Sequence, residues 1–348
     1  MNTTMRGLVK ETAGPGGFVL HTDLPIPEIG EDEVLLQIRC TAFCGTDLHI
    51  LEWDEWSRRR VKAPFIPGHE TVGVIVAAGE KVTDRRVGQR VSCETHIPCG
   101  ECWFCQNGMP HICQNVKLFG VTQDGAFAEY AKIRADCTFP IDDAISDEAA
   151  CMFEPMGAGV HGVEAADVAG KTVLVSGCGP IGLMVVGACR AHGAKRVIAC
   201  DLFDEKLERA RAMGADDVLN SGREDVAETV RRLTDGSGAD AAIDITGNGQ
   251  AIEIGLKTLR KAGIFVSVGL PNGKVALDLT EDIIYREIVY TGVSGRRMFE
   301  TWEDCMQILQ VPGFSLEPVI GGVYKLEAFE DALTAIRSGV PGKMILVP

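Results

Sequence analysis

The chain has 348 residues, of which 46% are hydrophobic and 24% are charged, a length and balance that predict about two globular domains with ample core. Its formal net charge of −15 at pH 7 argues against a nucleic-acid-binding surface, because such surfaces are basic. No apolar run approaches the ~18 residues that a membrane-spanning helix needs, so we expect no membrane segment, and residues 1–10 contain no apolar signal segment.

Short runs of apolar residues, punctuated by Gly and Pro, fill the chain before residue 155. Two examples are Val34–Ile38 and Thr71–Val76. Short strands separated by turn residues are typical of a barrel-like, mostly-β domain. We therefore predict such a domain for the N-terminal part of the chain.

This region also carries a thiol, an imidazole and two carboxylates, namely Cys44, His69, Glu70 and, further on, Glu154. One ligand of each kind can hold a catalytic zinc ion whose fourth position stays open for water or substrate. The spacing leaves open whether Glu70, Glu154 or both supply the carboxylate. A zinc ion in such a site acts as a Lewis acid toward an alcohol and favours the loss of hydride. Taken singly, each residue is equally typical of a buried cysteine, a core histidine or a surface acid.

Two further residues follow Cys44 closely. Thr46 and His49 lie two and five positions after the thiol. A hydroxyl and an imidazole at these positions suit a relay that carries the proton of the alcohol, through the cofactor ribose, to solvent. They are candidate catalytic residues.

Four more thiols form a compact cluster at the spacing C-x2-C-x2-C-x7-C: Cys99, Cys102, Cys105 and Cys113. Four thiolates are the ligand set of a closed, structural zinc site. An iron–sulfur cluster is an alternative, although its common spacing ends C-x3-C-P. Disulfides are a second alternative, but cysteines so close in sequence pair poorly. The remaining cysteines in apolar stretches are expected to be buried, and a reducing cytoplasm suits the pattern best.

From about Gly170 the pattern changes to alternating strands and helices. We predict strands at 172–175, 196–200, 218–219, 241–245, 263–268 and 288–291, and helices at 180–192, 204–213, 224–233 and 250–259. Alternation of this kind indicates a doubly wound parallel sheet. The helix at 299–310 and the tail after it lack this rhythm. We therefore expect a second domain at 158–297, and a first domain at 1–157 to which 298–348 returns.

The first strand of the second domain leads into a glycine-rich turn. Gly177, Gly179 and Gly182 match G-x-G-x-x-G between a predicted strand and a predicted helix, and Asp201 follows nineteen residues later. This context is the dinucleotide-binding pattern, in which phosphates meet the helix N-terminus. Asp201 can accept hydrogen bonds from the adenosine ribose and would repel a 2′-phosphate, so NAD is favoured over NADP. A flavin is possible on the same fold but would not explain the metal sites.

These motifs together resemble the zinc-dependent medium-chain alcohol dehydrogenases, over essentially the whole chain. The segments 44–57 and 295–302 more specifically resemble the threonine-oxidising branch of that family. The resemblance implies an α/β protein with a GroES-like, mostly-β catalytic domain and a Rossmann domain. It implies oxidation of the C3 hydroxyl of L-threonine by NAD to 2-amino-3-oxobutanoate, two zinc ions per chain, and a homotetramer.

The resemblance also implies roles for individual residues. Cys44, His69 and Glu70 become ligands of the catalytic zinc, Thr46 and His49 the relay, and Glu154 an acid that aids the relay. The implied NAD contacts are Ile181, Asp201, Lys206, Val268, Gly269, Leu270, Val293 and Ser294. Lys206 departs from the family pattern, in which we expect Arg.

Two other functions remain open from the sequence. Residues 154–161 also resemble the polyol dehydrogenase branch, so a polyol or vicinal-diol dehydrogenase is one alternative. The other is a non-catalytic, NAD-binding redox sensor, against which the intact Cys44, Thr46 and His49 argue. If threonine is the substrate, Glu154 can face its ammonium group, and His96, Arg296 or Arg297 its carboxylate.

Overall fold

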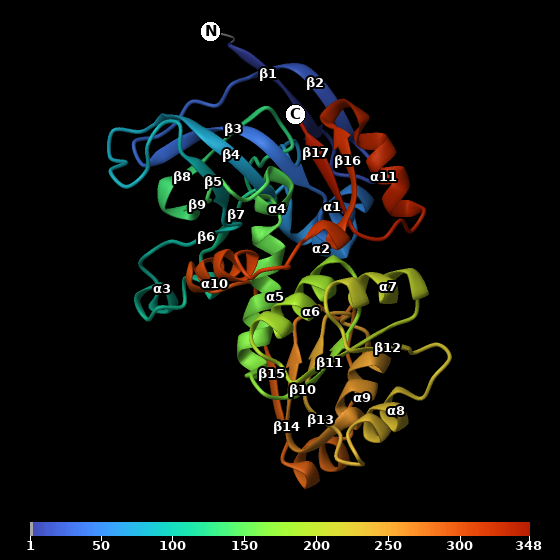
Figure 1. The fold of residues 1–348 in the computed structure, drawn as a ribbon. Coiled ribbons are helices and arrows are strands. Elements are labelled where there is room, and N and C mark those ends of the chain that lie inside the picture. Colours follow the sequence, from blue (N-terminus) through green and yellow to red (C-terminus); the bar gives the residue numbers. More distant parts are fainter. Residues whose placement is uncertain (1–2) are drawn as a thin grey trace. The chain divides into compact units, whose positions relative to one another are not determined.

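The computed structural model describes residues 3–348 and divides the chain into two compact units (Figure 1). The first unit comprises the chain up to Glu154 together with Ile320–Pro348, and the second is Pro155–Val319. Among residues 3–348, no helix has the length and apolar character needed to cross a bilayer.

The first unit is mostly β, as the sequence predicts. Within residues 33–347, seven strands form one sheet in the order β16-β17-β3-β4-β5-β9, with β8 also paired to β3. Their bounds are β3 Glu33–Ala42, β4 Glu70–Ala78, β5 Arg90–Cys93, β8 Tyr130–Arg134, β9 Thr138–Pro140, β16 Ile320–Lys325 and β17 Lys343–Val347. The strands β1 (Thr4–Lys10) and β2 (Phe18–Pro25) form a separate hairpin, and β6 (His96–Ile97) pairs with β7 (Lys117–Leu118).

Short helices connect these strands. They are α1 Gly45–Glu52, α2 Glu55–Arg60, α3 Trp103–Gln106, α4 Asp147–Ala150 and α11 Phe329–Arg337. A buried cluster that includes Phe43, Trp53, Phe127 and Leu346 packs β17, α1 and the loops around them together. Because β17 pairs with the end of β3, the C-terminal strand lies beside the segment that leads into α1. This pairing brings residues from opposite ends of the chain to one place.

The second unit contains the parallel sheet that the sequence predicts. Within residues 172–292, six parallel strands lie in the order β12-β11-β10-β13-β14-β15. Numbered from β10, that order is 3-2-1-4-5-6, the arrangement of the Rossmann fold. The strands are β10 Thr172–Ser176, β11 Arg196–Asp201, β12 Asp217–Asn220, β13 Ala239–Asp244, β14 Leu259–Ser267 and β15 Val289–Gly292.

The helices of the second unit also agree with the predicted ones to within two residues at each end. They are α6 Pro180–Ala191, α7 Asp204–Ala212, α8 Val226–Leu233, α9 Gly249–Thr258 and α10 Glu300–Leu309. The long helix α5 (Phe153–Ala166), which precedes β10, is not among the predicted elements. The side chains of Val173, Leu174 and Val175 in β10 are fully buried, as expected for a central strand covered by helices.

The division of the chain differs from the expected one at both ends of the second unit. We expected 298–348 to return to the first domain, but the return begins at Ile320, and the segment with α10 belongs to the second unit. The reason is packing against α6: His192 hydrogen-bonds Asp304 at 2.8 Å, and the ring of Phe314 occupies the space beside Gly187. At the other end, the second unit begins at Pro155 and so takes most of α5.

Candidate functional site

Cys44, His69 and Glu70 converge in the first unit. Cys44 precedes α1, while His69 and Glu70 lie where β4 begins. One ligand atom from each residue lies within 4.8 Å of those of the other two. Two ligands of a tetrahedral zinc ion are roughly 3.3–3.8 Å apart, given zinc–ligand bonds of 2.0–2.3 Å. A soft thiolate, an imidazole and a carboxylate at this separation fit a zinc ion.

Unsatisfied polar atoms beside this cluster support the same conclusion. Glu70 Oε2 and His69 Nδ1 are buried without a hydrogen-bond partner anywhere in the described chain, as is Asp47 Oδ1, which lies 3.9 Å from His69 Nδ1. Buried polar atoms normally have a partner, and a carboxylate oxygen left unpaired beside a thiol and an imidazole suits a bound cation. The cluster therefore has the character of a metal centre.

A buried lysine neutralises part of the negative charge. Lys343, the first residue of β17, donates from Nζ to Glu70 Oε1 and to the carbonyl oxygen of Phe43, the latter at 3.2 Å. Burial raises the pKa of Glu70 well above its usual range, although the ammonium of Lys343 opposes that shift. Burial lowers the pKa of Lys343, but the Glu70 carboxylate outweighs it, and the net pKa is raised.

The positions of Thr46 and His49 follow from α1. Thr46 Oγ1 lies 3.7 Å from Cys44 Sγ, within hydrogen-bond distance for sulfur. His49 Nδ1 lies 2.6 Å from Asp54 Oδ2, and the His49 side chain is 47% exposed. A carboxylate only accepts, so Nδ1 carries the proton and Nε2 remains the basic nitrogen. Asp54 stays ionised because the backbone N–H of Ser57, above all, lowers its pKa.

Glu154 lies outside the cluster of three ligand atoms. Its Oε1 accepts a hydrogen bond of 2.6 Å from Thr95 Oγ1, and its side chain is almost wholly buried. Burial is the main cause that raises the pKa of Asp47 and of Glu70, and the charge of Glu154 adds to both shifts. The structure thus brings Glu70, rather than Glu154, together with the thiol and the imidazole.

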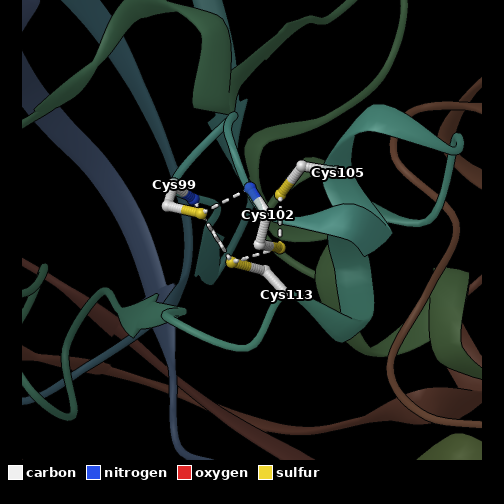
Figure 2. Close-up of side chains that lie close together, drawn as sticks. All are labelled: Cys99, Cys102, Cys105 and Cys113. Carbon is white, nitrogen blue, oxygen red and sulfur yellow. Dashed lines mark hydrogen bonds between the residues drawn. The ribbon is translucent and has the colours of Figure 1, made fainter.

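The four clustered cysteines surround one point (Figure 2). The sulfur of Cys102 lies 3.5 Å from that of Cys105 and 3.8 Å from that of Cys113, which is 3.5 Å from that of Cys99. A tetrahedron with zinc–sulfur bonds of 2.3 Å has edges of about 3.8 Å, whereas a disulfide bond is about 2.05 Å. The sulfur spacing fits a tetrahedral metal ion and does not fit disulfides.

Backbone N–H groups around this point favour thiolates. Donors from Cys105 and Gln114 lower the pKa of Cys102 to about 6, and the N–H of Glu101, above all, lowers the pKa of Cys99. Desolvation, followed by a hydrogen bond to Cys102, raises the pKa of Cys105 to about 12. Metal ligation requires deprotonated thiols, and the lowered pKa values of Cys102 and Cys99 favour their thiolate forms.

The glycine-rich turn of the second unit has the form that phosphate binding needs. Gly177 has a φ of +94°, and a Cβ on Gly182 would stand 1.8 Å from the Gly177 carbonyl oxygen. Gly179 is the N-cap of α6, and nothing lies within 4 Å of where its Cβ would be. The N-terminus of a twelve-residue helix is therefore open to an anion.

Asp201 ends β11 and faces this turn. Its Oδ2 accepts from Cys178 N at 2.8 Å, and its Oδ1 accepts from Phe203 N at 3.1 Å. The N-cap of α7 is Phe203, so Asp201 is not a helix cap. Lys206 Nζ lies 4.8 Å from the centre of the Phe203 ring.

The other predicted cofactor contacts follow the carboxyl ends of strands in the same sheet. Val268 N and Gly269 N both donate to the Asp244 carbonyl oxygen, at 2.9 and 3.0 Å, and Leu270 is 85% exposed. Val293 N donates to Ser267 O at 3.0 Å, which places Ser294 just beyond β15, and Ile181 lies in the first turn of α6. Ligands of open α/β sheets bind at this edge.

Comparison with known proteins agrees with the two-unit architecture. Residues 30–143 match the alcohol dehydrogenase GroES-like domain, and residues 180–310 match the zinc-binding dehydrogenase family. The chain is 41% identical to an L-threonine 3-dehydrogenase of Bacillus subtilis (strain 168), over 99% of each chain. This chain belongs to the zinc-binding alcohol dehydrogenase family.

Solved structures give the same result for this zinc-binding dehydrogenase. A short chain alcohol dehydrogenase from Escherichia coli CFT073, complexed with NADH, is 26% identical with a TM-score of 0.90 and full coverage of both chains. Galactitol-1-phosphate dehydrogenase from Escherichia coli is 28% identical with a TM-score of 0.91, over 99% of this chain and 100% of that one.

Sequence reasoning missed several residues around the metal centre of this dehydrogenase. Asp47, Asp54, Thr95 and Lys343 all contact or surround predicted site residues. A lysine that begins an apolar strand is a signal for a buried ion pair, and Asp54 in Asp-x-x-Ser is a helix-capping signal. Neither signal shows that Lys343 pairs with Glu70 or that Asp54 pairs with His49.

The candidate groups for a substrate carboxylate are already engaged. His96 hydrogen-bonds Glu94 through its backbone N and through Nδ1, both at 2.9 Å. Arg297 pairs with Glu164 and with Glu300. Arg296 is only 3% exposed.

Proposed function

We propose that this dehydrogenase oxidises the C3 hydroxyl of L-threonine with NAD and forms 2-amino-3-oxobutanoate. Hydride leaves C3 for the nicotinamide and the hydroxyl proton leaves for solvent, so the products are the ketone, NADH and H⁺. The observation that carries the proposal is the Cys44–His69–Glu70 cluster in a chain 41% identical, over 99% of its length, to a threonine dehydrogenase.

The proposal assigns two zinc ions to each chain. Cys44, His69 and Glu70 would hold the catalytic ion, which when bound supplies Lewis-acid polarisation of the substrate hydroxyl. Cys99, Cys102, Cys105 and Cys113 would hold the structural ion. The donor atoms and their spacing support both assignments.

Proton removal falls to Thr46 and His49. Asp54 holds the His49 proton on Nδ1, which leaves Nε2 to accept the proton that the substrate loses. Because the His49 ring is about half exposed, it can pass that proton on to water. Thr46, beside Cys44, provides a hydroxyl between the metal ligands and His49 in sequence and along α1.

Glu154 supplies a second acid near the metal centre. Thr95 orients its carboxyl group, and burial keeps it away from bulk water. We assign it an accessory part in the proton relay and attraction of the substrate ammonium group. A buried carboxylate discriminates strongly in favour of a cationic partner.

The cofactor assignment is NAD. The open N-terminus of α6 would receive the pyrophosphate, and Asp201 would exchange its backbone partners for the hydroxyls of the adenosine ribose. A carboxylate at this position repels the 2′-phosphate of NADP. The NADH-bound relative, at 26% identity, supports a nicotinamide cofactor.

A homotetramer in the cytoplasm completes the proposal. The edge strand β15 and the segment before it expose several large apolar side chains: Leu279, Ile284, Tyr285, Val289 and Tyr290. An exposed apolar edge strand is suited to pairing with another chain.

Each of the thirteen cysteines, all in the described part of the chain, is free, which suits a reducing compartment.

A substrate panel separates this proposal from its alternatives. Purified protein with zinc and NAD should oxidise L-threonine with a kcat/KM at least about 10⁴-fold above that for sorbitol or 2,3-butanediol. Comparable kcat/KM values for threonine and sorbitol would favour the polyol alternative. The structural similarity to galactitol-1-phosphate dehydrogenase is the observation behind that alternative. NAD binding without oxidation of any alcohol would favour a redox sensor.

A further inference from the structure

The glycines of helix α5 bring it close to three predicted cofactor-binding segments. A Cβ on Gly162 would stand 2.7 Å from Val268 Cγ2. A Cβ on Gly159 would stand 2.9 Å from Val185 Cγ2 and 3.6 Å from Ile181 Cγ2. The side chains of Val268, Val185 and Ile181, in the segments after β14 and β10, therefore pack directly against the backbone of the helix.

The third segment is the turn after β15, and α5 holds it by a hydrogen bond. His161 Nδ1 lies 3.1 Å from the carbonyl oxygen of Gly295. A carbonyl oxygen only accepts, so His161 Nδ1 carries a proton and donates it. Burial lowers the pKa of His161, which favours the neutral ring with its one proton on Nδ1. Gly295 has a φ of +56°, a conformation that favours glycine.

Two flanking contacts lie on the same side of α5. Gly157, His161 and Glu164 are spaced four and three residues apart, so they share one helix face. A Cβ on Gly157 would stand 3.2 Å from Arg296 Cδ, so the buried Arg296 side chain packs closely against the helix at this glycine. Glu164 pairs with Arg297. Three consecutive residues, Gly295 to Arg297, are thus fixed on three positions of one helix.

We infer that His161 is a positioning residue for NAD: by holding the Gly295 carbonyl, it fixes the turn that presents Val293 and Ser294 to the cofactor. The inference rests on the proposed function, which places NAD at this edge of the sheet. Val293 is anchored on its other side, because its N–H donates to Ser267 at the end of β14. The turn is therefore held at Val293 by Ser267 and at Gly295 by His161, which restricts the conformation of Ser294 between them.

The position of β15 defines which half of NAD is affected. Strands β10 to β12 form the half of the sheet whose acid, Asp201, serves the adenosine ribose, and β13 to β15 form the other half. The turn after β15 therefore serves the nicotinamide half. Loss of the His161 donor removes a hydrogen bond from the part-buried Gly295 carbonyl, and it should weaken NADH binding about tenfold, while binding of 5′-AMP stays unchanged.

Three variants of the full-length holoenzyme test the inference by calorimetric titration with NADH and with 5′-AMP. His161→Phe keeps a ring but removes the donor, and His161→Asn keeps a donor near the position of Nδ1. Val163→Ala, at a fully buried position of the same helix, is the matched control for general loss of packing. We expect a tenfold rise in the Kd for NADH only in His161→Phe, with His161→Asn within about threefold of the parent protein.

Two results would overturn the inference: an unchanged Kd for NADH in His161→Phe, or equal weakening of NADH and 5′-AMP. If His161→Phe fails to fold, His161→Leu gives the same test, because it also removes the donor to Gly295; unchanged NADH affinity there also contradicts the inference. Failure of the unsubstituted protein to bind NADH would instead refute the proposed function, so the two failures are distinguishable.

Discussion

Asp201, the proposed acceptor for the adenosine ribose, is held by two backbone hydrogen bonds. Both of its oxygens accept backbone N–H groups, one of which belongs to the glycine-rich turn itself. The same carboxylate thus supports the turn and sets the charge at the point where a 2′-phosphate would lie. Substitution of Asp201 should therefore change both the affinity for NAD and the preference for NAD over NADP.

Replacement of Asp201 by Ser should raise the use of NADP relative to NAD, because the repulsive charge is removed. Affinity for NAD should fall at the same time, since the ribose loses its acceptor. The measurement is kcat/KM for both cofactors with the same alcohol. Glu205→Ser is the control, because Glu205 is an exposed acid in the first turn of α7. A cofactor ratio that is the same in Asp201→Ser and Glu205→Ser would mean that another residue distinguishes the two cofactors.

His49 and Thr46 should each affect turnover rather than cofactor binding. His49→Ala or Thr46→Ala should lower kcat by about 10²-fold or more, the usual effect of losing general acid–base assistance. The Kd for NADH should change little. Glu52→Ala, at an exposed position of the same helix, controls for disturbance of α1. If His49→Ala retains full kcat, the His49–Asp54 pair is structural only.

Beyond single residues, the pairing of β17 with β3 brings Lys343 to Glu70 of β4. Removing one partner of a buried ion pair costs about 3 kcal/mol or more, because the remaining charge is left unpaired. Lys343→Met should therefore lower Tm by roughly 6–12 °C. The double variant Lys343→Met with Glu70→Gln should recover most of that loss in differential scanning calorimetry when both proteins are compared with the catalytic zinc removed, because Glu70 is also a proposed zinc ligand. No recovery would show that the pair is not what makes Lys343 important.

The four-cysteine loop between β6 and β7 should depend on its metal. Cys102→Ser should release one zinc ion per chain and lower thermal stability, because binding of a structural zinc is coupled to folding of its loop. The remaining zinc should stay bound at the Cys44 cluster. Elemental analysis with calorimetry provides the measurement, and Cys189→Ala, a buried thiol in α6, provides the control. Retention of two zinc ions by Cys102→Ser would contradict the structural assignment.

The elements that sequence predicts well are those whose contacts are local. The glycine-rich turn and the four cysteines are each contained in a short segment, and the strands and helices of the second unit alternate in a regular pattern. Pairs such as Lys343 and Glu70, 273 residues apart, depend on strand register and cannot be derived from local pattern. The segment 298–319 was misplaced for a related reason: it has no strand–helix rhythm, and only its packing on α6 assigns it.

For the whole chain, the proposed function requires two metal ions and one nicotinamide cofactor. Purified protein should contain two zinc ions per chain by elemental analysis, one for each cluster of donors. Removal of the ion held by Cys44, His69 and Glu70 should abolish alcohol oxidation, and zinc should restore it. A fully active protein with a single zinc ion would contradict the assignment of one cluster.

Hydride transfer from threonine itself tests the proposed activity most directly. L-Threonine that carries deuterium at C3 is incubated with the zinc-loaded protein and NAD, and the reduced cofactor is analysed by mass spectrometry. If threonine is the hydride donor, the reduced cofactor carries the deuterium and lies one mass unit above NADH formed from unlabelled threonine. Unlabelled NADH, or no NADH from threonine while sorbitol reduces NAD under the same conditions, would contradict it.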